Sequence, residues 1–417
     1  MLATVNRLKS SALVKDSLIY GLTNALYSGL PILILPLLTK ILSPVDYGMV
    51  EFYRNLSLVL IPVLGLSTVQ SIIRFYYDLE ETDFKTFVGN IVSLHFVSAA
   101  LGMSLLYLCT FFIENTYWWI IFYCIIFFLF NQLIEIQLSI FRAKKQARSY
   151  LMLRVSCIVL DLFLLFIFYL YRDQFDWTYR VLPNVLAAIL VGLLTIGILY
   201  KQGYLLKGNK RLLKLSLSYS LPLILHMVSG YILNIGDRFF ILYFLSEEDL
   251  GNYAVAYQLG MLVNFLYTSF NLAWLPTFIE MMKGKKHEQI HKIRKATYLA
   301  VIFFSMFIIG LVQFLLLFTD IFDNYSIQFN LVIIISVAYV FMSFYRFESN
   351  YFFYVKDTKS LSVITLGAAL ITILLNVVLI PQIHLYGCAI ATLVAGIYMY
   401  VFVVMKSRKY EKSTEKI

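Results

Sequence analysis

Residues Thr297–Thr319, TYLAVIFFSMFIIGLVQFLLLFT, decide the fold class of this chain. The stretch carries no charged side chain, and it is longer than the about 20 residues that an α-helix needs to cross roughly 30 Å of hydrocarbon. Only a helix satisfies its own backbone hydrogen bonds within one such segment. The stretch therefore predicts a membrane-spanning helix.

Similar apolar runs occupy the rest of the 417 residues, which are 60% hydrophobic and only 14% charged. A soluble protein carries about 25% charged residues. The runs predict twelve spans, near residues 17–39, 49–73, 88–112, 117–141, 151–171, 180–200, 215–244, 252–277, 297–319, 328–352, 360–380 and 385–405. The predicted fold class is an all-α integral membrane protein.

The basic residues predict the orientation of these spans. Of the 34 Lys and Arg, 29 fall in the two termini, in the connections that follow every even-numbered span, or in the span ends beside these connections. Short segments rich in Lys and Arg stay in the cytoplasm, so we expect both termini there. The net charge of +10 is explained by these segments, and no nucleic-acid partner is expected.

An internal repeat divides the chain. Leu42–Gly48, LSPVDYG, follows the first predicted span, and Leu245–Gly251, LSEEDLG, follows the seventh, 203 residues later. Leu, Ser, Asp and Gly recur at equal offsets. Because six spans separate the copies, both halves have the same orientation. This predicts two six-helix bundles, residues 1–208 and 209–417, related by a pseudo-two-fold axis along the membrane normal, with the substrate path between them.

Charged side chains inside spans are costly and usually functional. The predicted path residues, substrate-binding or lining the route, are Arg54, Arg74, Arg238, Arg346 and Glu348. The residues predicted to couple transport to an ion or to pair with a charge are Asp161, Asp237 and Glu135. A simpler interpretation stays open: arginines near span ends extend to the membrane surface, and Asp237 only pairs with a neighbour.

No metal site is expected. His287–His291, HEQIH, matches the H-E-x-x-H pattern of zinc proteases. It lies in a basic segment predicted to be cytoplasmic, and no acidic residue follows before Asp320, so a third ligand is lacking. The four cysteines fall inside or beside apolar runs without metal-ligand spacing.

Several fragments resemble one family when taken in order. They are Tyr20-Gly21 to Gly48, Arg74-Phe75-Tyr76-Tyr77, Asp237-Arg238-Phe239-Phe240 with Gly251-Asn252-Tyr253, and Leu375-Asn376 to Ala389-Ile390-Ala391-Thr392. The chain resembles bacterial polysaccharide flippases of the O-antigen type, in the multidrug/oligosaccharidyl-lipid/polysaccharide (MOP) superfamily.

The resemblance implies a function that composition does not show. Such proteins move an undecaprenyl-pyrophosphate-linked oligosaccharide from the cytoplasmic to the periplasmic leaflet of the inner membrane by alternating access. It implies no covalent chemistry, no cofactor beyond a coupling ion (H⁺ or Na⁺), and lipid-linked oligosaccharide and membrane lipid as partners. Other membrane proteins of polysaccharide assembly are candidate partners.

Two alternatives stay open. One is a cation-coupled drug exporter of the same superfamily, which the intramembrane arginines disfavour because they repel cations. The other is a membrane enzyme, either a protease or a polysaccharide polymerase or ligase. The short outer connections disfavour a polymerase, because by family resemblance polymerases carry a large periplasmic loop.

Overall fold

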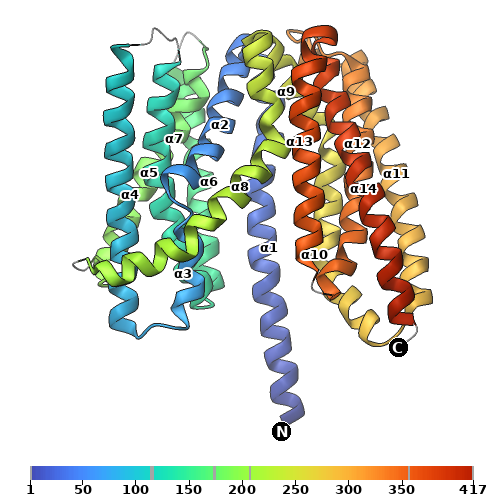
Figure 1. Cartoon of the computed structure of the whole chain (residues 1–417). Coiled ribbons are helices and arrows are strands. Elements are labelled where there is room, and N and C mark those ends of the chain that lie inside the picture. The colour runs from blue at the N-terminus through green and yellow to red at the C-terminus, as the bar shows by residue number, and fades with distance from the viewer. Residues whose placement is uncertain (1, 113–116, 172–174, 206–207, 356, 416–417) are drawn as a thin grey trace. The chain divides into compact units, whose positions relative to one another are not determined.

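The computed structural model describes residues 2–112, 117–171, 175–205, 208–355 and 357–415 of the chain, with the side chains of some helical residues left out (Figure 1). These residues form fourteen α-helices, one short 3₁₀ helix and turns, and no strand occurs among them. The predicted all-α fold is confirmed.

Every predicted span coincides with one helix or with two consecutive helices. Within the described residues, nine helices are long and apolar enough to cross a membrane, and the bent pair α2 and α3 makes a tenth candidate. The two other predicted spans correspond to α8 and to the pair α9 and α10. The protein is therefore a multi-pass α-helical membrane protein.

Unit 1 consists of Met1–Leu30 and Phe52–Tyr231. Its helices are the first part of α1 (Leu2–Ile41), most of α2 (Pro44–Leu64), α3 (Val69–Tyr76), α4 (Glu81–Thr110), α5 (Trp118–Ala143), α6 (Ala147–Tyr171), α7 (Thr178–Lys201) and the beginning of α8 (Lys210–Phe244). Helix α5 is central, because it packs against α3, α4, α6 and α7. Its Phe128 and Ile136 side chains are fully buried.

The second span of unit 1 is broken rather than continuous. Helices α2 and α3 meet at 51°. Leu66 and Ser67 between them have positive φ angles of 48° and 52°, and the Thr68 hydroxyl donates to the Gly65 carbonyl at 2.8 Å. A Cβ atom on Gly65 would lie 2.4 Å from Nε2 of Gln132. It would also lie 2.7 Å from the backbone carbonyl oxygen of Ile61, which cannot rotate away, so a side chain at this position would strain the bend.

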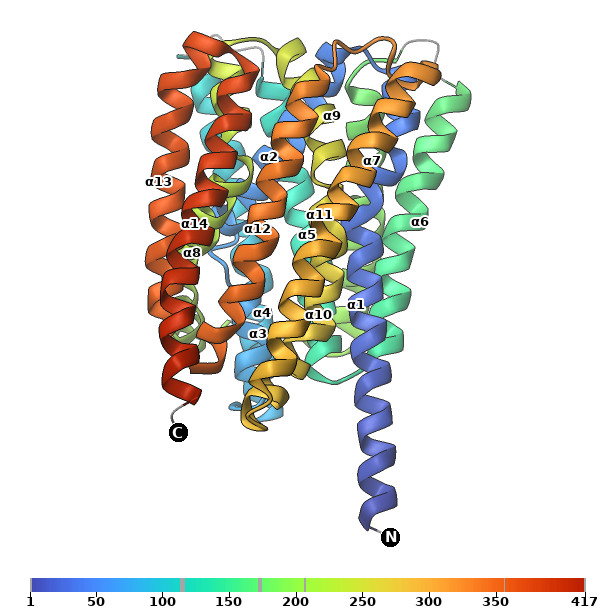
Figure 2. The ribbon, with the colours of Figure 1, turned by 90° about the vertical axis from the view of Figure 1, so that its right-hand side faces the viewer.

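Unit 2 consists of Pro31–Glu51 and Ile232–Ile417. It contains α9 (Glu247–Gly260), α10 (Leu262–Lys283), α11 (His287–Phe318), the 3₁₀ helix η1 (Asp320–Phe322), α12 (Phe329–Val355), α13 (Thr358–Ile383) and α14 (Leu385–Glu415). Helix α12 is central and packs against α9, α10, α11, α13 and α14; Figure 2 shows it between α14 and α11. Helices α5 and α12 are the fourth spans of the two predicted repeats. The predicted boundary between residues 208 and 209 stays a prediction.

The two copies of the repeated motif lie against each other in unit 2. Each serine accepts a hydrogen bond from the backbone of its aspartate, Asp46 or Asp249, at 3.1 Å and so caps α2 or α9. A Cβ on Gly48 would lie 2.0 Å from the Glu247 carbonyl oxygen, and one on Gly251 would lie 1.9 Å from that of Pro44. The contact uses equivalent atoms of both copies, as a two-fold repeat predicts.

Candidate functional site

The intramembrane carboxylate Asp161 is held by an arginine in unit 1. Arg180 on α7 donates from Nη1 to Oδ1 and from Nη2 to Oδ2 of Asp161 on α6, both at 2.8 Å. Asn184, one turn further along α7, donates to Oδ1 at 3.4 Å. Both charged side chains are nearly buried. A bidentate pair of this kind is among the stronger polar contacts, so Arg180 neutralises the charge of Asp161 within unit 1.

A second pair lies further along α6. Arg154 donates to Glu135 of α5 at 2.7 Å, and its guanidinium lies 4.2 Å from the ring centre of Tyr27 on α1. Arg154 and Asp161 are seven residues apart, which places them on the same face of α6 and about 10 Å apart along its axis. Unit 1 therefore contains an internal column of two ion pairs.

In unit 2, Asp237 and Arg238 pair with each other. Arg238 Nη1 lies 2.6 Å from Asp237 Oδ1, and the Tyr253 hydroxyl donates to Asp237 Oδ2 at 2.6 Å. The Arg238 guanidinium lies 4.0 Å from the ring centre of Tyr257. Arg238 is only 2% exposed. The Tyr253 and Tyr257 side chains that contact this pair lie in unit 2 as well.

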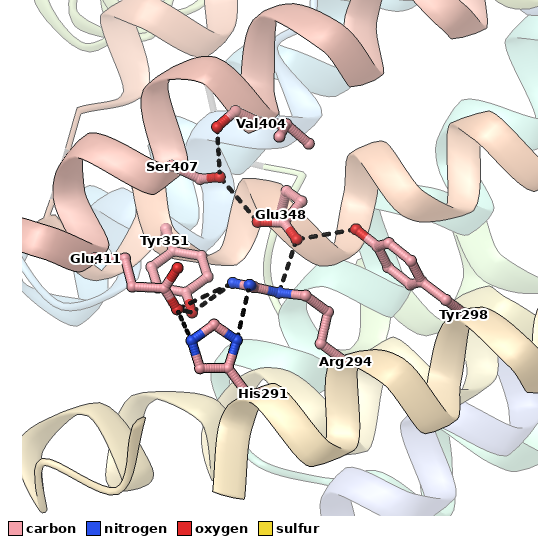
Figure 3. A network of polar contacts seen from close by, with 8 residues as sticks. All are labelled: His291, Arg294, Tyr298, Glu348, Tyr351, Val404, Ser407 and Glu411. Atoms are coloured by element: carbon pink, nitrogen blue, oxygen red, sulfur yellow. Dashed lines mark hydrogen bonds and ion pairs between the residues drawn. The ribbon is translucent and has the colours of Figure 1, made fainter. Parts of the chain in front are cut away.

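Glu348 belongs to a larger network, drawn in Figure 3. Arg294 of α11 contacts Glu348 of α12 through Nε at 2.9 Å and Glu411 of α14 through Nη2 at 3.1 Å. Tyr351 accepts from Arg294 at 2.8 Å and donates to Glu411 at 2.7 Å. Ser407 of α14 donates to the second oxygen of Glu348 at 2.8 Å. The network joins three helices of unit 2.

The H-E-x-x-H motif lies at the beginning of α11, beside this network. His291 Nε2 is 3.4 Å from a Glu411 oxygen, and Nδ1 is 3.2 Å from Arg294 Nη1. Glu288 pairs with Lys292 at 2.7 Å on the exposed helix surface. No group of three potential metal ligands occurs in the described part of the chain. The motif's second histidine thus contacts the ion-pair network.

Arg346 differs from these arginines. It lies half-buried on α12, and its Nη1 atom donates to the Asn264 side-chain oxygen and, at 2.9 Å, to the Thr268 hydroxyl on α10. Within the residues that the structure describes, no carboxylate pairs with it. Its described hydrogen-bond partners, Asn264 and Thr268, are both neutral.

The remaining predicted path residues lie in unit 1. Arg74 lies in the last turn of α3, where its largely exposed side chain pairs with Asp78 at 2.6 Å. Arg54 lies partly buried on α2. Two of the five predicted path residues thus belong to unit 1, and within unit 2 the residues Arg238, Arg346 and Glu348 have different direct partners.

Sequence reasoning missed the arginines that neutralise these carboxylates. By their positions in the sequence, Arg154 and Arg294 belong to the basic residues that orient the spans, and Arg180 lies at the outer end of a span, whereas the structure places all three on helices with mostly buried side chains. One signal was available in unit 1. Arg154 follows Glu135, and Arg180 follows Asp161, by the same 19 residues, and each pair joins two consecutive predicted spans.

The fold defines a multi-pass helical membrane protein whose helices are joined by ion pairs. Comparison with known proteins adds its family. A family model described as polysaccharide biosynthesis protein matches residues 13–282. A protein of the Lsg locus of Haemophilus influenzae is 28% identical over 67% of this chain and 69% of its own length. An uncharacterized membrane protein of the same organism is 26% identical over 90% and 94%.

Two solved structures share the fold. The lipid II flippase MurJ, in an inward closed conformation, has a TM-score of 0.67 at 13% identity and covers 98% of this chain and 90% of its own. An inward-facing multidrug resistance MATE family transporter of the MOP superfamily has a TM-score of 0.65 at 15% identity, with 96% of each chain covered.

The chain belongs to the polysaccharide biosynthesis protein family. Its fold is shared with the lipid II flippase MurJ and with the MATE family transporter.

Proposed function

We propose that this protein moves a lipid-linked oligosaccharide, an undecaprenyl-pyrophosphate-linked O-antigen or similar repeat unit, from the cytoplasmic to the periplasmic leaflet of the bacterial inner membrane. Transport proceeds by alternating access and without covalent chemistry. The observation that carries the proposal is Arg346, a half-buried arginine in a span with neutral partners only, in a chain of this family.

The chemistry of the substrate explains why such an arginine is useful. The prenyl tail of the substrate stays in lipid, so only the pyrophosphate and the glycan need a polar route. A guanidinium stays charged at all physiological pH values and offers a planar fork of donors that matches phosphate oxygens. An arginine that already pairs with a carboxylate has little charge left for phosphate, whereas Arg346 has all of it.

The paired carboxylates support this route indirectly. An unpaired charge inside a span is expensive, so the arginines beside Asp161, Glu135 and Asp237 keep these helices packed during transport. A coupling ion, H⁺ or Na⁺, remains part of the proposal. Its binding would compete with an arginine for one of these carboxylates.

The test is an export assay in a strain that lacks the protein. We expect Arg346→Ala to abolish surface polysaccharide at normal membrane levels, and Arg346→Lys to restore it only partly, because lysine keeps the charge and loses the fork. Arg148→Ala, which removes an exposed arginine at the beginning of α6, is the control and should export normally. If Arg346→Ala exports polysaccharide at the parental rate, Arg346 does not bind the pyrophosphate.

The material that accumulates separates the alternatives. A flippase deletion should trap complete repeat units on lipid at the cytoplasmic leaflet. A polymerase deletion should still place single repeat units on the cell surface. A drug exporter deletion should leave the polysaccharide unchanged and increase sensitivity to cationic drugs.

A further inference from the structure

A polar strip extends from Arg346 along α10 in unit 2. Asn264, Thr268 and Asn271 are four and three residues apart, so they share one face of α10. Helix α10 packs against α12, which carries Arg346. We call Asn264, Thr268, Asn271 and Arg346 the donor strip. Asn264 and Asn271 are separated by about 10 Å along the helix axis, which gives room for a phosphate group and one sugar ring side by side.

The oxygen acceptors near Arg346 are already used within the protein. A guanidinium only donates hydrogen bonds, so Asn264 must turn its side-chain oxygen toward Arg346, and its amide N–H groups then point elsewhere. The Thr268 oxygen accepts from the same nitrogen at 2.9 Å. The two N–H groups of the Asn264 side-chain amide have no hydrogen-bond partner in the described part of the chain.

The same holds further along the strip. The side-chain oxygen of Asn271 accepts from Asn350 Nδ2 at 3.1 Å and from the Tyr267 hydroxyl at 3.4 Å. Asn350 is fully buried, and its own oxygen has no partner among the described residues. Asn350 thus fixes Asn271 from behind, and the amide nitrogen of Asn271 has no protein partner within the described residues.

The strip is not sealed inside the protein. Asn264 and Asn271 are half-buried and Thr268 is exposed. Donors that face hydrocarbon without a partner cost several kcal/mol each. A face of this kind inside predicted spans is therefore expected to meet a polar ligand rather than lipid tails. Because its free groups are donors and one cation, the ligand must present acceptors and negative charge.

We propose that the donor strip binds the junction between the pyrophosphate and the first sugar of the substrate. Arg346 binds phosphate oxygens, and Asn264 and Asn271 donate to oxygen acceptors of the attached sugar, so Asn271 helps to select that sugar. This inference rests on the proposed function and adds a sugar-reading element to it.

The experiment measures binding to the purified full-length protein in detergent with three probes: farnesol, farnesyl pyrophosphate, and farnesyl pyrophosphate carrying one N-acetylhexosamine. We expect the parental protein to prefer the sugar-bearing probe over farnesyl pyrophosphate by at least about fivefold, which is the value of one hydrogen bond. Asn271→Ala should abolish this preference and leave the affinity for farnesyl pyrophosphate unchanged. Arg346→Ala should weaken both pyrophosphate probes.

A matched control breaks the same internal hydrogen bond from its other end. Asn350→Ala removes the bond to Asn271 without removing the outward donor, so it should lower thermal stability and retain the sugar preference. If Asn271→Ala does not fold, Asn271→Asp keeps the oxygen that Asn350 contacts and removes the donor. It should lose the preference as well.

The outcomes separate the two proposals. Equal binding of all three probes by the parental protein would contradict the pyrophosphate site and hence the proposed function. Preference for pyrophosphate without preference for the sugar, or an unchanged preference in Asn271→Ala, would leave the proposed function standing and overturn the sugar-reading strip. Loss of the preference in Asn350→Ala to the same degree as in Asn271→Ala would assign both residues a packing role only, and would also overturn it.

Discussion

Alanine at Gly48 or Gly251 should separate the two repeat motifs of unit 2. The added methyl group would lie 2.0 Å from the carbonyl oxygen of Glu247 in the first variant and 1.9 Å from that of Pro44 in the second, whereas ordinary contact begins at 3.4 Å. Both obstacles are backbone atoms, which do not rotate away. Helices α2 and α9 would therefore have to move apart by about 1.4 Å at this crossing.

The magnitude follows from the hydrogen bonds beside the crossing. Gln258 of α9 donates to the Tyr47 hydroxyl at 2.7 Å and to Glu51 at 2.8 Å on α2, and a displacement of about 1.4 Å breaks both. Two such bonds contribute about 1 kcal/mol each, and forced overpacking adds about 1–3 kcal/mol. We expect each variant to lose about 3 kcal/mol of stability or more, and the two losses to be similar because the contact uses equivalent atoms.

Thermal unfolding in detergent, followed by size-exclusion chromatography, measures this loss. Gly197→Ala and Gly310→Ala are matched controls, because a Cβ at either helical position meets no atom within 4 Å. They should be neutral or stabilising by up to about 1 kcal/mol, since alanine favours helix over glycine. If Gly48→Ala and Gly251→Ala unfold at the parental temperature, or if only one of them is destabilised, the inferred symmetric crossing is wrong.

Three further predictions follow from the ion pairs, the histidines and the basic segments. Asp161→Ala and Arg180→Ala should each lower the free energy of unfolding by about 3–5 kcal/mol, because each leaves a buried charge unpaired. The double variant should regain part of this stability, and strictly additive losses in a double-mutant cycle would contradict the ion pair. Replacing His287 and His291 by alanine should preserve export, and loss of export together with one bound zinc per chain would reverse that conclusion. A cysteine that replaces exposed Gln289 in a cysteine-free protein should react with an impermeant reagent only from the cytoplasm; labelling from the periplasm would invert the predicted topology.

The helices were predictable because membrane hydrocarbon imposes one simple condition on every span. A run of apolar residues such as Thr297–Thr319 must be helical whatever its neighbours are. The break between α2 and α3 was not predictable in the same way. Residues 49–73 read as one continuous span, whereas the helix breaks at residues 65–68, where Gly65 packs against Gln132 of α5; such a tertiary contact is not encoded in hydropathy.

For the charged residues too, the sequence predicted which positions are unusual but not which residues they contact. Composition and position identified Asp161 and Glu348 as unusual, because a carboxylate in a span is costly whatever it contacts. Their partners depended on how the helices pack. Arg294 belongs to the basic segment before α11 in sequence, and only the packing of α11 against α12 brings it to Glu348 at 2.9 Å.

Arg238 and Arg346 looked alike in sequence, and their surroundings give them different roles. Removing the Arg238 side chain leaves Asp237 buried with two neutral partners, the Tyr253 hydroxyl and the backbone N–H of residue 238, and breaking a buried pair of this kind costs about 3–5 kcal/mol of stability. Arg238→Ala should therefore lower the amount of folded protein in the membrane, whereas Arg346→Ala, which leaves only the neutral Asn264 and Thr268 behind, should not. Quantifying both variants in isolated membranes beside the export assay separates a packing arginine from a substrate-binding one. If Arg238→Ala reaches normal membrane levels and export is abolished, Arg238 acts in substrate transport rather than in packing.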